Sequence, residues 1–242
     1  MIIQKVDEAA KSAGIKATIY GPAGSGKTFA ISTIPEPESV LILSAEAGLM
    51  SIRNNATGMN AAIINNIEDM REAFALVRDS GDKYKTVVLD SLSEIAQQIL
   101  AKELGSKGSE FSGESVDDNI KIDGRAAYGN MATRVMGLAK SFRDLNGKNV
   151  ILVCQEERIQ DESGRIYYGP SMPGKKVGSA ITYLTDLVFA LRVRPNAETG
   201  ELERMFQTSP LANEMYVAKD RSGALNMMES PHWGDIFNKI NG

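Results

Sequence analysis

Residues 17–32, ATIYGPAGSGKTFAIS, decide how the rest of the chain is interpreted. The pattern G-x-x-x-x-G-K-T runs from Gly21 to Thr28, after an apolar run typical of a strand and before a sequence typical of a helix. In that context it predicts a P-loop, because its glycines let backbone N–H groups converge on phosphate oxygens. We expect Lys27 to reach the β- and γ-phosphates of a nucleotide and the Thr28 hydroxyl to join a Mg²⁺ shell. The residues expected around the nucleotide are Gly21, Pro22, Ala23, Gly24, Ser25, Gly26, Lys27 and Thr28.

Segments typical of strands and of helices alternate along the chain around this loop. The expected strands cover residues 15–20, 39–44, 85–90 and 149–155, and the expected helices begin at residue 26 and cover residues 67–77, 93–104 and 126–145. Asn66 is a candidate cap for the second of these helices. The continuous Val, Ile and Leu runs indicate strands buried on both faces, which predicts an α/β fold with a mainly parallel, twisted sheet and helices on both faces.

The pattern changes in the last quarter of the chain, where short runs are separated by turn signals. These runs predict antiparallel strands that extend one edge of the sheet. They cover residues 185–194, 202–209 and 214–218. The tail, residues 227–242, has apolar residues at helical spacing and predicts a helix packed on the body. We therefore expect one domain over residues 1–242, with residues 1–14 as an N-terminal segment.

The composition excludes several classes of protein. With 43% hydrophobic and 24% charged residues, the 242-residue chain has the make-up of an ordinary globular protein. The lone Cys154 rules out an intrachain disulfide and fits a reducing compartment, and one Cys with one His cannot build a zinc site. The N-terminus has no apolar signal segment, and no run approaches the length of a membrane span. We expect a cytoplasmic protein without a membrane partner, whose net charge of −4 leaves nucleic-acid binding to a local patch.

Three further apolar runs end in residues that suit phosphate chemistry. Asp90 closes the run KTVVLD and is placed to hold a magnesium ion beside Thr28. Glu46 follows the run VLILS, at the carboxyl edge of the sheet where ligands of such folds bind, and is a candidate to orient water. Gln155 closes the run NVILVCQ, and its amide can donate to a γ-phosphate while it accepts from another group.

This order of motifs, a P-loop followed by strands that end in Ala-Glu, Asp-Ser and Gln, resembles the RecA-like ATPase core. The resemblance covers residues 15–226 and implies an ATPase that uses ATP and Mg²⁺. It implies that Glu46 activates the attacking water, that Asp90 supports Mg²⁺, and that Gln155 couples the γ-phosphate to DNA binding. The compact length, the GPAGSGKT loop and the sequence AKDRSG are most similar to the small phage-encoded members, which are nucleotide-binding proteins or single-strand-annealing recombinases.

The RecA-like resemblance also places single-stranded DNA on two loops, here residues 105–128 and 156–176. The second loop combines tyrosines, which offer stacking faces, with cations, although four acids balance its charge. The alternative is that one tyrosine packs in the core and the other lies on a strand surface. The candidate contacts of the second loop are Arg158, Arg165, Tyr167, Tyr168, Lys175 and Lys176. Those of the first loop are Lys107, Phe111, Lys121 and Arg125.

Near the C-terminus, the sequence VAKDRSGA at residues 217–224 places two cations around Asp220. In RecA-like assemblies a K-x-R or K-x-K pair after a strand reaches the γ-phosphate of the neighbouring subunit, so the resemblance implies that Lys219 and Arg221 act in trans. Residues i and i+2 of an extended strand point to the same side, so both cations can face one phosphate. This interpretation predicts a homo-oligomer with ATP between subunits, and its alternative is a solvated hairpin tip.

The sequence therefore favours an ATP-dependent, oligomeric protein that binds single-stranded DNA in phage-type homologous recombination or strand annealing. A single-strand-binding protein is a further candidate partner. The nearest alternative is a ring-forming, helicase-like motor or accessory ATPase with the same core. A nucleotide-gated binding module with little turnover would use the same site. A small-molecule kinase is disfavoured because the region after Gln155 holds mixed charge and tyrosines in place of an arginine-rich lid.

Overall fold

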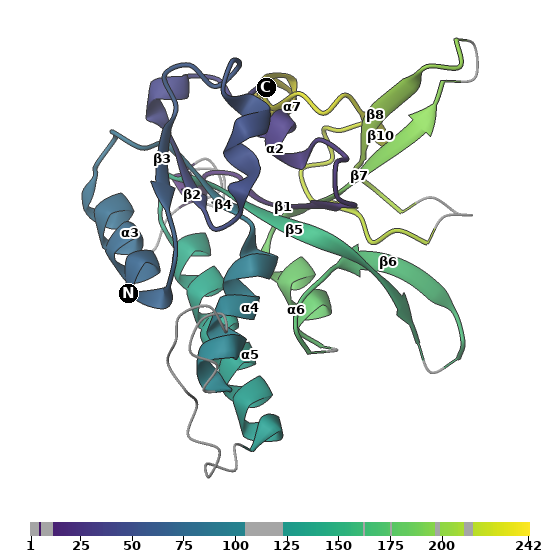
Figure 1. Cartoon of the computed structure of the whole chain (residues 1–242). Helices are drawn as coiled ribbons and strands as arrows, with labels where there is room; N and C mark the ends of the chain where they lie inside the picture. Colours follow the sequence, from purple (N-terminus) through teal and green to yellow (C-terminus); the bar gives the residue numbers. More distant parts are fainter. Residues whose placement is uncertain are drawn as a thin grey trace.

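The strand that leads into the P-loop lies inside one large mixed sheet (Figure 1). The computed structural model describes residues 5, 12–104, 123–161, 163–174, 176–196, 199–210 and 215–242. The strands are β1 (Lys16–Gly21), β2 (Val40–Ser44), β3 (Asn60–Ile63), β4 (Thr86–Asp90), β5 (Asn149–Gln160), β6 (Ile166–Pro170), β7 (Leu187–Pro195), β8 (Leu202–Gln207), β9 (Lys219–Asp220) and β10 (Met228–Glu229). Neighbouring strands follow the order β10-β8-β7-β1-β5-β4-β2-β3, with β6 paired to β5 and β9 paired to β7.

The middle of the sheet is parallel. Strands β7, β1, β5, β4, β2 and β3 pair with their neighbours in parallel, whereas β8 and β10 extend the sheet beyond β7 as antiparallel strands. Strands β1, β2 and β4 are buried along their whole length, as expected for parallel strands with helices on both faces. The expected fold class, an α/β core with a mainly parallel sheet, helices on both faces and an antiparallel C-terminal extension, is confirmed.

Helices cover both faces of the sheet and close two hydrophobic cores (Figure 1). One face carries α3 (Ile67–Asp79), α4 (Leu92–Glu103), α5 (Gly124–Arg143) and α6 (Val177–Leu184), and the other carries α2 (Lys27–Ile31) and α7 (Trp233–Asn241). Two short 3₁₀ helices, η1 (Pro37–Ser39) and η2 (Ala47–Ile52), flank β2. Trp233 of the tail helix is fully buried in the same core as Ile31 of α2, which confirms the expected packed C-terminal helix.

Side-chain caps fix where the three long helices begin. Asn66 accepts a hydrogen bond from the backbone N–H of Asp69 at 2.9 Å, which confirms it as the cap of α3. Ser91 caps α4 and Asp123 caps α5 in the same way, each through a side-chain oxygen. Within the described part of the chain, no helix has both the length and the apolar character that crossing a membrane requires.

Several sequence-based expectations about strands are wrong. β7 was expected to be antiparallel, but it pairs in parallel with β1, because α6 returns the chain before β7 begins, and it is antiparallel to β8 and β9. Residues 215–218 form no strand beyond an isolated bridge at Tyr216, and the strand is β9. β3 was not expected, because its sequence Asn-Ala-Ala-Ile has few residues that favour strands.

Candidate functional site

The loop between β1 and α2 has the backbone geometry that a P-loop requires. Gly24 and Gly26 have positive φ angles of 74° and 100°, which residues with a Cβ rarely adopt. A Cβ on Gly21 would lie 2.9 Å from the carbonyl oxygen of Leu191, so this position also requires glycine. Inside the loop, the Ser25 hydroxyl oxygen is buried without a hydrogen-bond partner among the described residues. A phosphate would supply acceptors for this hydroxyl and for the convergent N–H groups.

The Lys27 ammonium group lies against the same loop. Its Nζ donates to the carbonyl oxygens of Gly21, at 2.8 Å, and Pro22, at 3.0 Å. Burial lowers the pKa of Lys27 and is the largest influence on it, while the carboxylates of Glu46 and Asp90 act in the opposite direction. Since charged acceptors make stronger hydrogen bonds than carbonyl groups, a phosphate oxygen would bind this ammonium group better than the loop does.

Thr28 and Asp90 form the pair expected to hold Mg²⁺. The Thr28 hydroxyl donates to Asp90 Oδ2 at 2.9 Å. Asp90 is 4% exposed, and this burial raises the pKa of its carboxyl group to about 6, although the hydrogen bond from Thr28 acts to lower it. Gly48 of η2 approaches closely, because a Cβ there would lie 3.3 Å from Thr28 Oγ1. A hydroxyl and a carboxylate beside a phosphate loop are the oxygen ligands that suit Mg²⁺, so these residues fit the ion.

The strand ends that carry Glu46 and Gln155 meet beside this pair. Register places Gln155 opposite Gly21, at the end of the parallel part of β5. Glu46 Oε1 accepts hydrogen bonds from Gln155 Nε2, at 3.0 Å, and from the Ser91 hydroxyl. The structure therefore brings together the P-loop and the three strand ends that the sequence singled out.

Two serines complete this arrangement and were missed in the sequence. Ser91 both caps α4 and donates to Glu46. The Ser93 hydroxyl accepts from the backbone N–H of Gln155 at 2.9 Å and donates to the carbonyl oxygen of Ser171 at 2.7 Å. The sequence LDSLSE indicated that hydroxyl groups lie near this strand end, because it places serines one and three residues after Asp90. Which groups those hydroxyls meet depends on strand register, which the local sequence does not specify.

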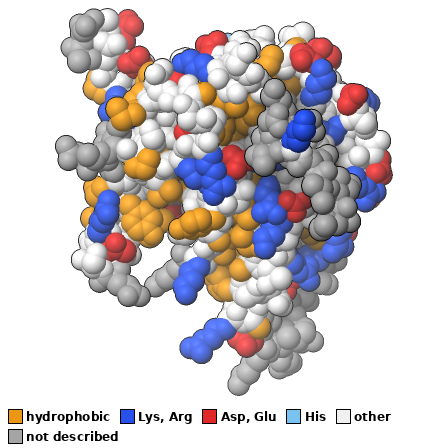
Figure 2. All heavy atoms as spheres, turned by 180° about the vertical axis from the view of Figure 1, so that it is seen from behind, with side chains coloured by type: hydrophobic (Ala, Val, Ile, Leu, Met, Phe, Trp, Pro, Cys, Tyr) orange, Lys and Arg blue, Asp and Glu red, His pale blue; other side chains and the backbone are white. Residues whose placement is uncertain are grey.

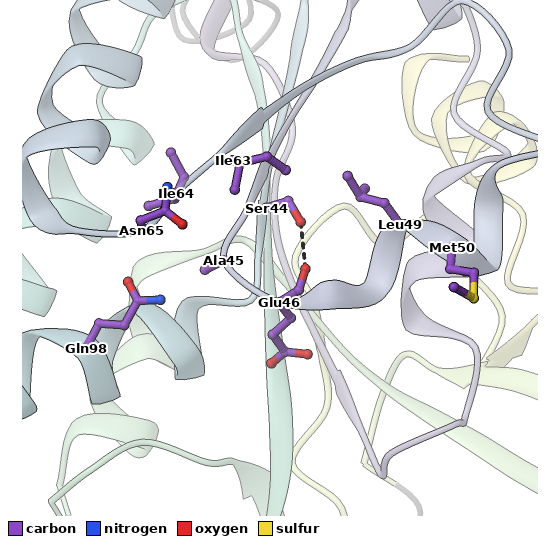
Figure 3. Close-up of a pocket in the computed structure, with 9 residues that line it drawn as sticks. All are labelled: Ser44, Ala45, Glu46, Leu49, Met50, Ile63, Ile64, Asn65 and Gln98. Carbon is purple, nitrogen blue, oxygen red and sulfur yellow. Dashed lines mark hydrogen bonds between the residues drawn. The ribbon is translucent and has the colours of Figure 1, made fainter. Parts of the chain in front are cut away.

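A pocket of about 400 Å³ opens beside Glu46, between the ends of β2 and β3, η2 and α4 (Figure 3). It is lined by Ser44, Ala45, Glu46, Leu49, Met50, Ile63, Ile64, Asn65 and Gln98. The Ser44 hydroxyl donates to the backbone carbonyl of Glu46 at 2.9 Å and so holds this strand end. In Figure 3 the Glu46 carboxylate points away from Leu49 and Met50. No lining residue belongs to the P-loop, so this pocket is a neighbouring space and not the phosphate site.

The segment expected to be the second DNA loop is mainly a β-hairpin, because β5 continues past Gln155 and pairs with β6. The pairing places Arg158 opposite Tyr168. The Tyr168 ring stacks on Tyr216 with centroids 4.8 Å apart and planes 14° apart, so one face of Tyr168 is covered. Tyr167 is half-buried and alternates to the other face of the hairpin. Tyr168 is also half-buried and belongs to neither hydrophobic core, so the alternative in which one tyrosine packs in the core describes neither of them.

The other candidate DNA contacts lie in different places. Arg158 is exposed on β5, and Arg165 is exposed in the turn that leads into β6. Lys176 is exposed at the start of α6, and Arg125 in the first turn of α5. Lys175 lies outside the described residues, as do residues 105–122 with Lys107, Phe111 and Lys121.

The two C-terminal cations lie at the edge of the sheet opposite the P-loop. Lys219 in β9 pairs with Val188, near the start of β7, and Arg221 follows one residue after β9. The P-loop instead follows Gly21 at the end of β1, which runs parallel to β7. Because of this separation, the two cations do not reach the phosphate site of their own chain.

Both cations have partners in their own chain. The Lys219 ammonium group donates to the carbonyl oxygen of Thr182, at 2.6 Å, and to that of Thr185, where α6 ends. Arg221 Nη1 lies 3.2 Å from Asp186 Oδ1, and both side chains are more than half exposed. Lys219 thus caps a helix, whereas Arg221 is the more accessible of the two.

A comparison with protein families finds a match over most of the chain. Residues 13–222 match the protein family described as AAA domain. Among solved structures, one match is a KaiC-like protein from the hyperthermophilic archaeon Pyrococcus horikoshii OT3, with a TM-score of 0.44 and 14% sequence identity, covering 86% of this chain and 83% of that chain. A search of the curated proteins finds no match. The family match spans the P-loop and the strand ends that carry Glu46, Asp90 and Gln155.

Proposed function

Because the chain belongs to the AAA-domain family, we propose that it hydrolyses ATP, with Mg²⁺, at the edge where β1, β2, β4 and β5 end. The observation that carries this proposal is the 3.0 Å hydrogen bond from Gln155 Nε2 to Glu46 Oε1. It lies at the same sheet edge as the P-loop and the Thr28–Asp90 pair. A carboxylate that is oriented by an amide and a hydroxyl, next to bound phosphates, is suited to accept a proton from water.

Each side chain has a role in this reaction. Lys27 binds oxygens of the β- and γ-phosphates and balances their charge. Glu46 accepts a proton from the attacking water while the bond from the γ-phosphorus to the bridging oxygen breaks. Gln155 orients Glu46 and contacts the γ-phosphate. Thr28 and Asp90 would hold Mg²⁺, which when bound supplies positive charge to the phosphate oxygens.

Glu46→Gln tests the proposal, because the amide keeps the shape of the side chain and cannot act as a base. We expect phosphate release to fall by about 10²–10⁴-fold. ATP affinity, measured by equilibrium titration, stays close to that of the wild type. Glu72→Gln, at an exposed position of α3, is the matched control. Normal phosphate release by Glu46→Gln would remove Glu46 from the mechanism, and a wild type that binds ATP without phosphate release would be a nucleotide-gated binding module.

We further propose a homo-oligomer in which Arg221, with Lys219, contacts the ATP of a neighbouring subunit. Two observations support this: the pair lies at the sheet edge opposite its own P-loop, and exposed ion pairs such as Arg221–Asp186 contribute at most about 1 kcal/mol, so they open easily. An arginine supplied in trans accelerates phosphoryl transfer by ~10³–10⁵-fold where this has been measured.

Mixing two inactive variants tests the trans contact. Arg221→Ala protein keeps an intact P-loop, and Lys27→Ala protein keeps Arg221, so mixed interfaces regain activity. Activity per subunit also rises with protein concentration as the oligomer forms. Arg78→Ala, which removes an exposed arginine of α3, is the control and keeps full activity. An absence of any recovery in the mixture, with activity independent of concentration in a monomer, would contradict the proposal.

The finer part of the proposal is binding of single-stranded DNA in phage-type recombination or strand annealing. The hairpin that continues from Gln155 supports this part of the proposal. Gln155, which is proposed to contact the γ-phosphate, and the exposed Arg158 lie on the same strand, β5, and the exposed Arg165 lies in the turn that follows it. Figure 2 shows Lys and Arg side chains beside apolar ones over much of the face it presents. Cations next to apolar and aromatic groups suit the backbone and bases of a single strand.

Gel shifts with labelled single strands, with and without an ATP analogue, test DNA binding. Replacing both Arg158 and Arg165 with Gln should weaken binding and reduce the dependence of log affinity on log salt by about 0.7 per lost phosphate contact. Replacing the exposed Arg78 with Gln serves as the control. No shift in either nucleotide state would overturn the DNA proposal. Duplex unwinding by a ring-shaped oligomer would point to a helicase-like motor instead.

A further inference from the structure

The three strand ends around the proposed ATP site all lie on one side of β1. In the sheet, the strands that lead to Gln155, Asp90 and Glu46 follow β1 in the order β5, β4, β2, whereas β7 and β8 lie on its other side. The phosphates of ATP form a chain with the γ-phosphate at one end and the nucleoside at the other. If the γ-phosphate meets Glu46, as the proposed function on which this inference rests requires, the nucleoside leaves the P-loop toward β7 and β8.

Arg204 and Phe29 border the P-loop on that side. Arg204 belongs to β8, and its Nε donates to the carbonyl oxygen of Ser25 at 3.1 Å. Phe29 follows Thr28 directly in the sequence. A Cβ on Gly26 would lie 3.2 Å from both Cδ and Nε of Arg204 and 4.0 Å from the Cβ of Phe29, so the two side chains flank the same point of the loop.

Packing does not account for the position of Phe29. The next two residues of α2, Ala30 and Ile31, are 2% and 0% exposed and belong to the core beneath the helix. Phe29 is 47% exposed and is not among the members of either core. Its place beside Gly26 of the P-loop, and not its exposure alone, makes it available to the apolar part of a ligand whose phosphates the loop binds.

We propose that Phe29 and Arg204 form a platform for the base of the bound nucleotide. A phenyl ring stacks on the face of any base, and a guanidinium group is planar, stacks on aromatic faces and is cationic. Purines cover more of such a platform than pyrimidines, because they have two fused rings. A platform that contacts the face of a base does not distinguish the hydrogen-bonding edges of adenine and guanine. ATP and GTP therefore bind with similar affinity, and both bind more tightly than CTP.

Calorimetric titration with ATP, GTP, CTP and inorganic triphosphate, each with Mg²⁺, separates contacts to the base from contacts to the phosphates. Phe29→Ala should weaken ATP and GTP binding about 10-fold, the size expected when one stacked ring is lost, and leave triphosphate binding unchanged. Phe29→Trp keeps a stacking surface and should restore ATP affinity. Arg204→Lys keeps the charge without the planar group, so it should weaken ATP more than triphosphate.

Tyr183→Ala is the matched control, because it removes an aromatic side chain that is 77% exposed on α6, and it should leave all four affinities unchanged. Unchanged ATP affinity in Phe29→Ala, or an equal loss for ATP and triphosphate, would overturn the platform. These outcomes differ from failure of the proposed function itself, in which the wild type would bind neither ATP nor triphosphate.

Discussion

Opposite edges of the sheet use lysine in different ways. At the amino edge, where the parallel strands begin, three lysines donate to carbonyl oxygens at or just after helix ends. They are Lys16 at the end of α5, Lys148 at the end of α3 and Lys219 at the end of α6. The last carbonyl groups of a helix have no partner within the helix and carry the negative end of its dipole, so an ammonium group completes the fold there. At the carboxyl edge, Lys27 donates to carbonyl groups of the P-loop, between two acids.

The same kind of hydrogen bond, from an ammonium group to a carbonyl oxygen, therefore stabilises the fold at one edge and prepares a binding site at the other. The surrounding groups decide which role it has. The acceptors of Lys16 and Lys148 at the amino edge are permanent parts of the fold. The acceptors of Lys27 are loop carbonyl groups that a phosphate can replace with a stronger, charged acceptor. We expect substitutions at the amino edge to change stability and the substitution of Lys27 to change ligand binding.

The largest effect is expected for Lys27→Ala. Loss of a charged hydrogen-bond donor to phosphate should weaken ATP binding by about 100-fold. The free energy of unfolding should change less than it does when a fully buried donor is lost, because the contact of Lys27 with Pro22 is exposed and its contact with Gly21 is only partly buried. Calorimetric titration and urea unfolding measure the two quantities, with the exposed Lys140→Ala of α5 as control. ATP affinity equal to that of the wild type would remove Lys27 from the nucleotide site.

An intermediate effect is expected for Lys148→Met, which should show the opposite pattern. Lys148 is 7% exposed, and its Nζ donates to the carbonyl oxygens of Tyr84, at 2.7 Å, and Gly81. Methionine fills the space but leaves those carbonyl groups without their donor, so the free energy of unfolding should fall by ~1–3 kcal/mol. ATP affinity should stay at the wild-type value. A loss of ATP affinity at an unchanged free energy of unfolding would contradict the assignment of the amino-edge lysines to stability and of Lys27 to ligand binding.

The smallest effect is a pH dependence of stability that comes from Lys16. Burial lowers the pKa of Lys16 to about 8 from 10.5, against the opposing charges of Asp186 and Asp144. Between these two pH values the unfolded chain binds more protons at this residue than the folded chain does, so the free energy of unfolding rises with pH.

Urea unfolding of the wild type and of Lys16→Met at several pH values from 8 to 9.5 measures this contribution. The upward slope with pH should be steeper in the wild type, because the variant lacks the titrating group. The lysine at residue 148, whose pKa burial also lowers, is present in both proteins and cancels from the difference. Equal slopes would show that the amine of Lys16 does not titrate in this range.

The residues of the candidate site differ in how far the sequence revealed them. The P-loop is a local pattern, so its position and backbone could be predicted outright. Glu46, Asp90 and Gln155 could be predicted because each follows an apolar run, and parallel strands bring their carboxyl ends to one edge. The bonds that join Glu46 to Ser91 and Gln155 depend on residues 45 and 109 positions apart in the chain, and the sequence did not reveal them.

The segment after Gln155 was misjudged. It was expected to be a loop because the RecA-like resemblance places single-stranded DNA on a loop there, whereas β5 continues through this segment and pairs with β6. Lys219, for which a trans contact is proposed, also has two acceptors in its own chain, 37 and 34 residues earlier. The local sequence did not reveal these contacts, because they depend on how α6 and β9 pack together.

The sequence by itself determined the P-loop, the α/β class and the three polar strand ends beside the P-loop, because short-range patterns of apolar and polar residues specify them. Only the tertiary structure decided which strands are neighbours, that Lys219 caps α6, and that Tyr168 stacks on Tyr216. It also placed Arg204 and Phe29 on the same side of the P-loop. These contacts join residues far apart in the chain, and they form because the sheet register and the packing of helices on its two faces bring those residues within bonding distance.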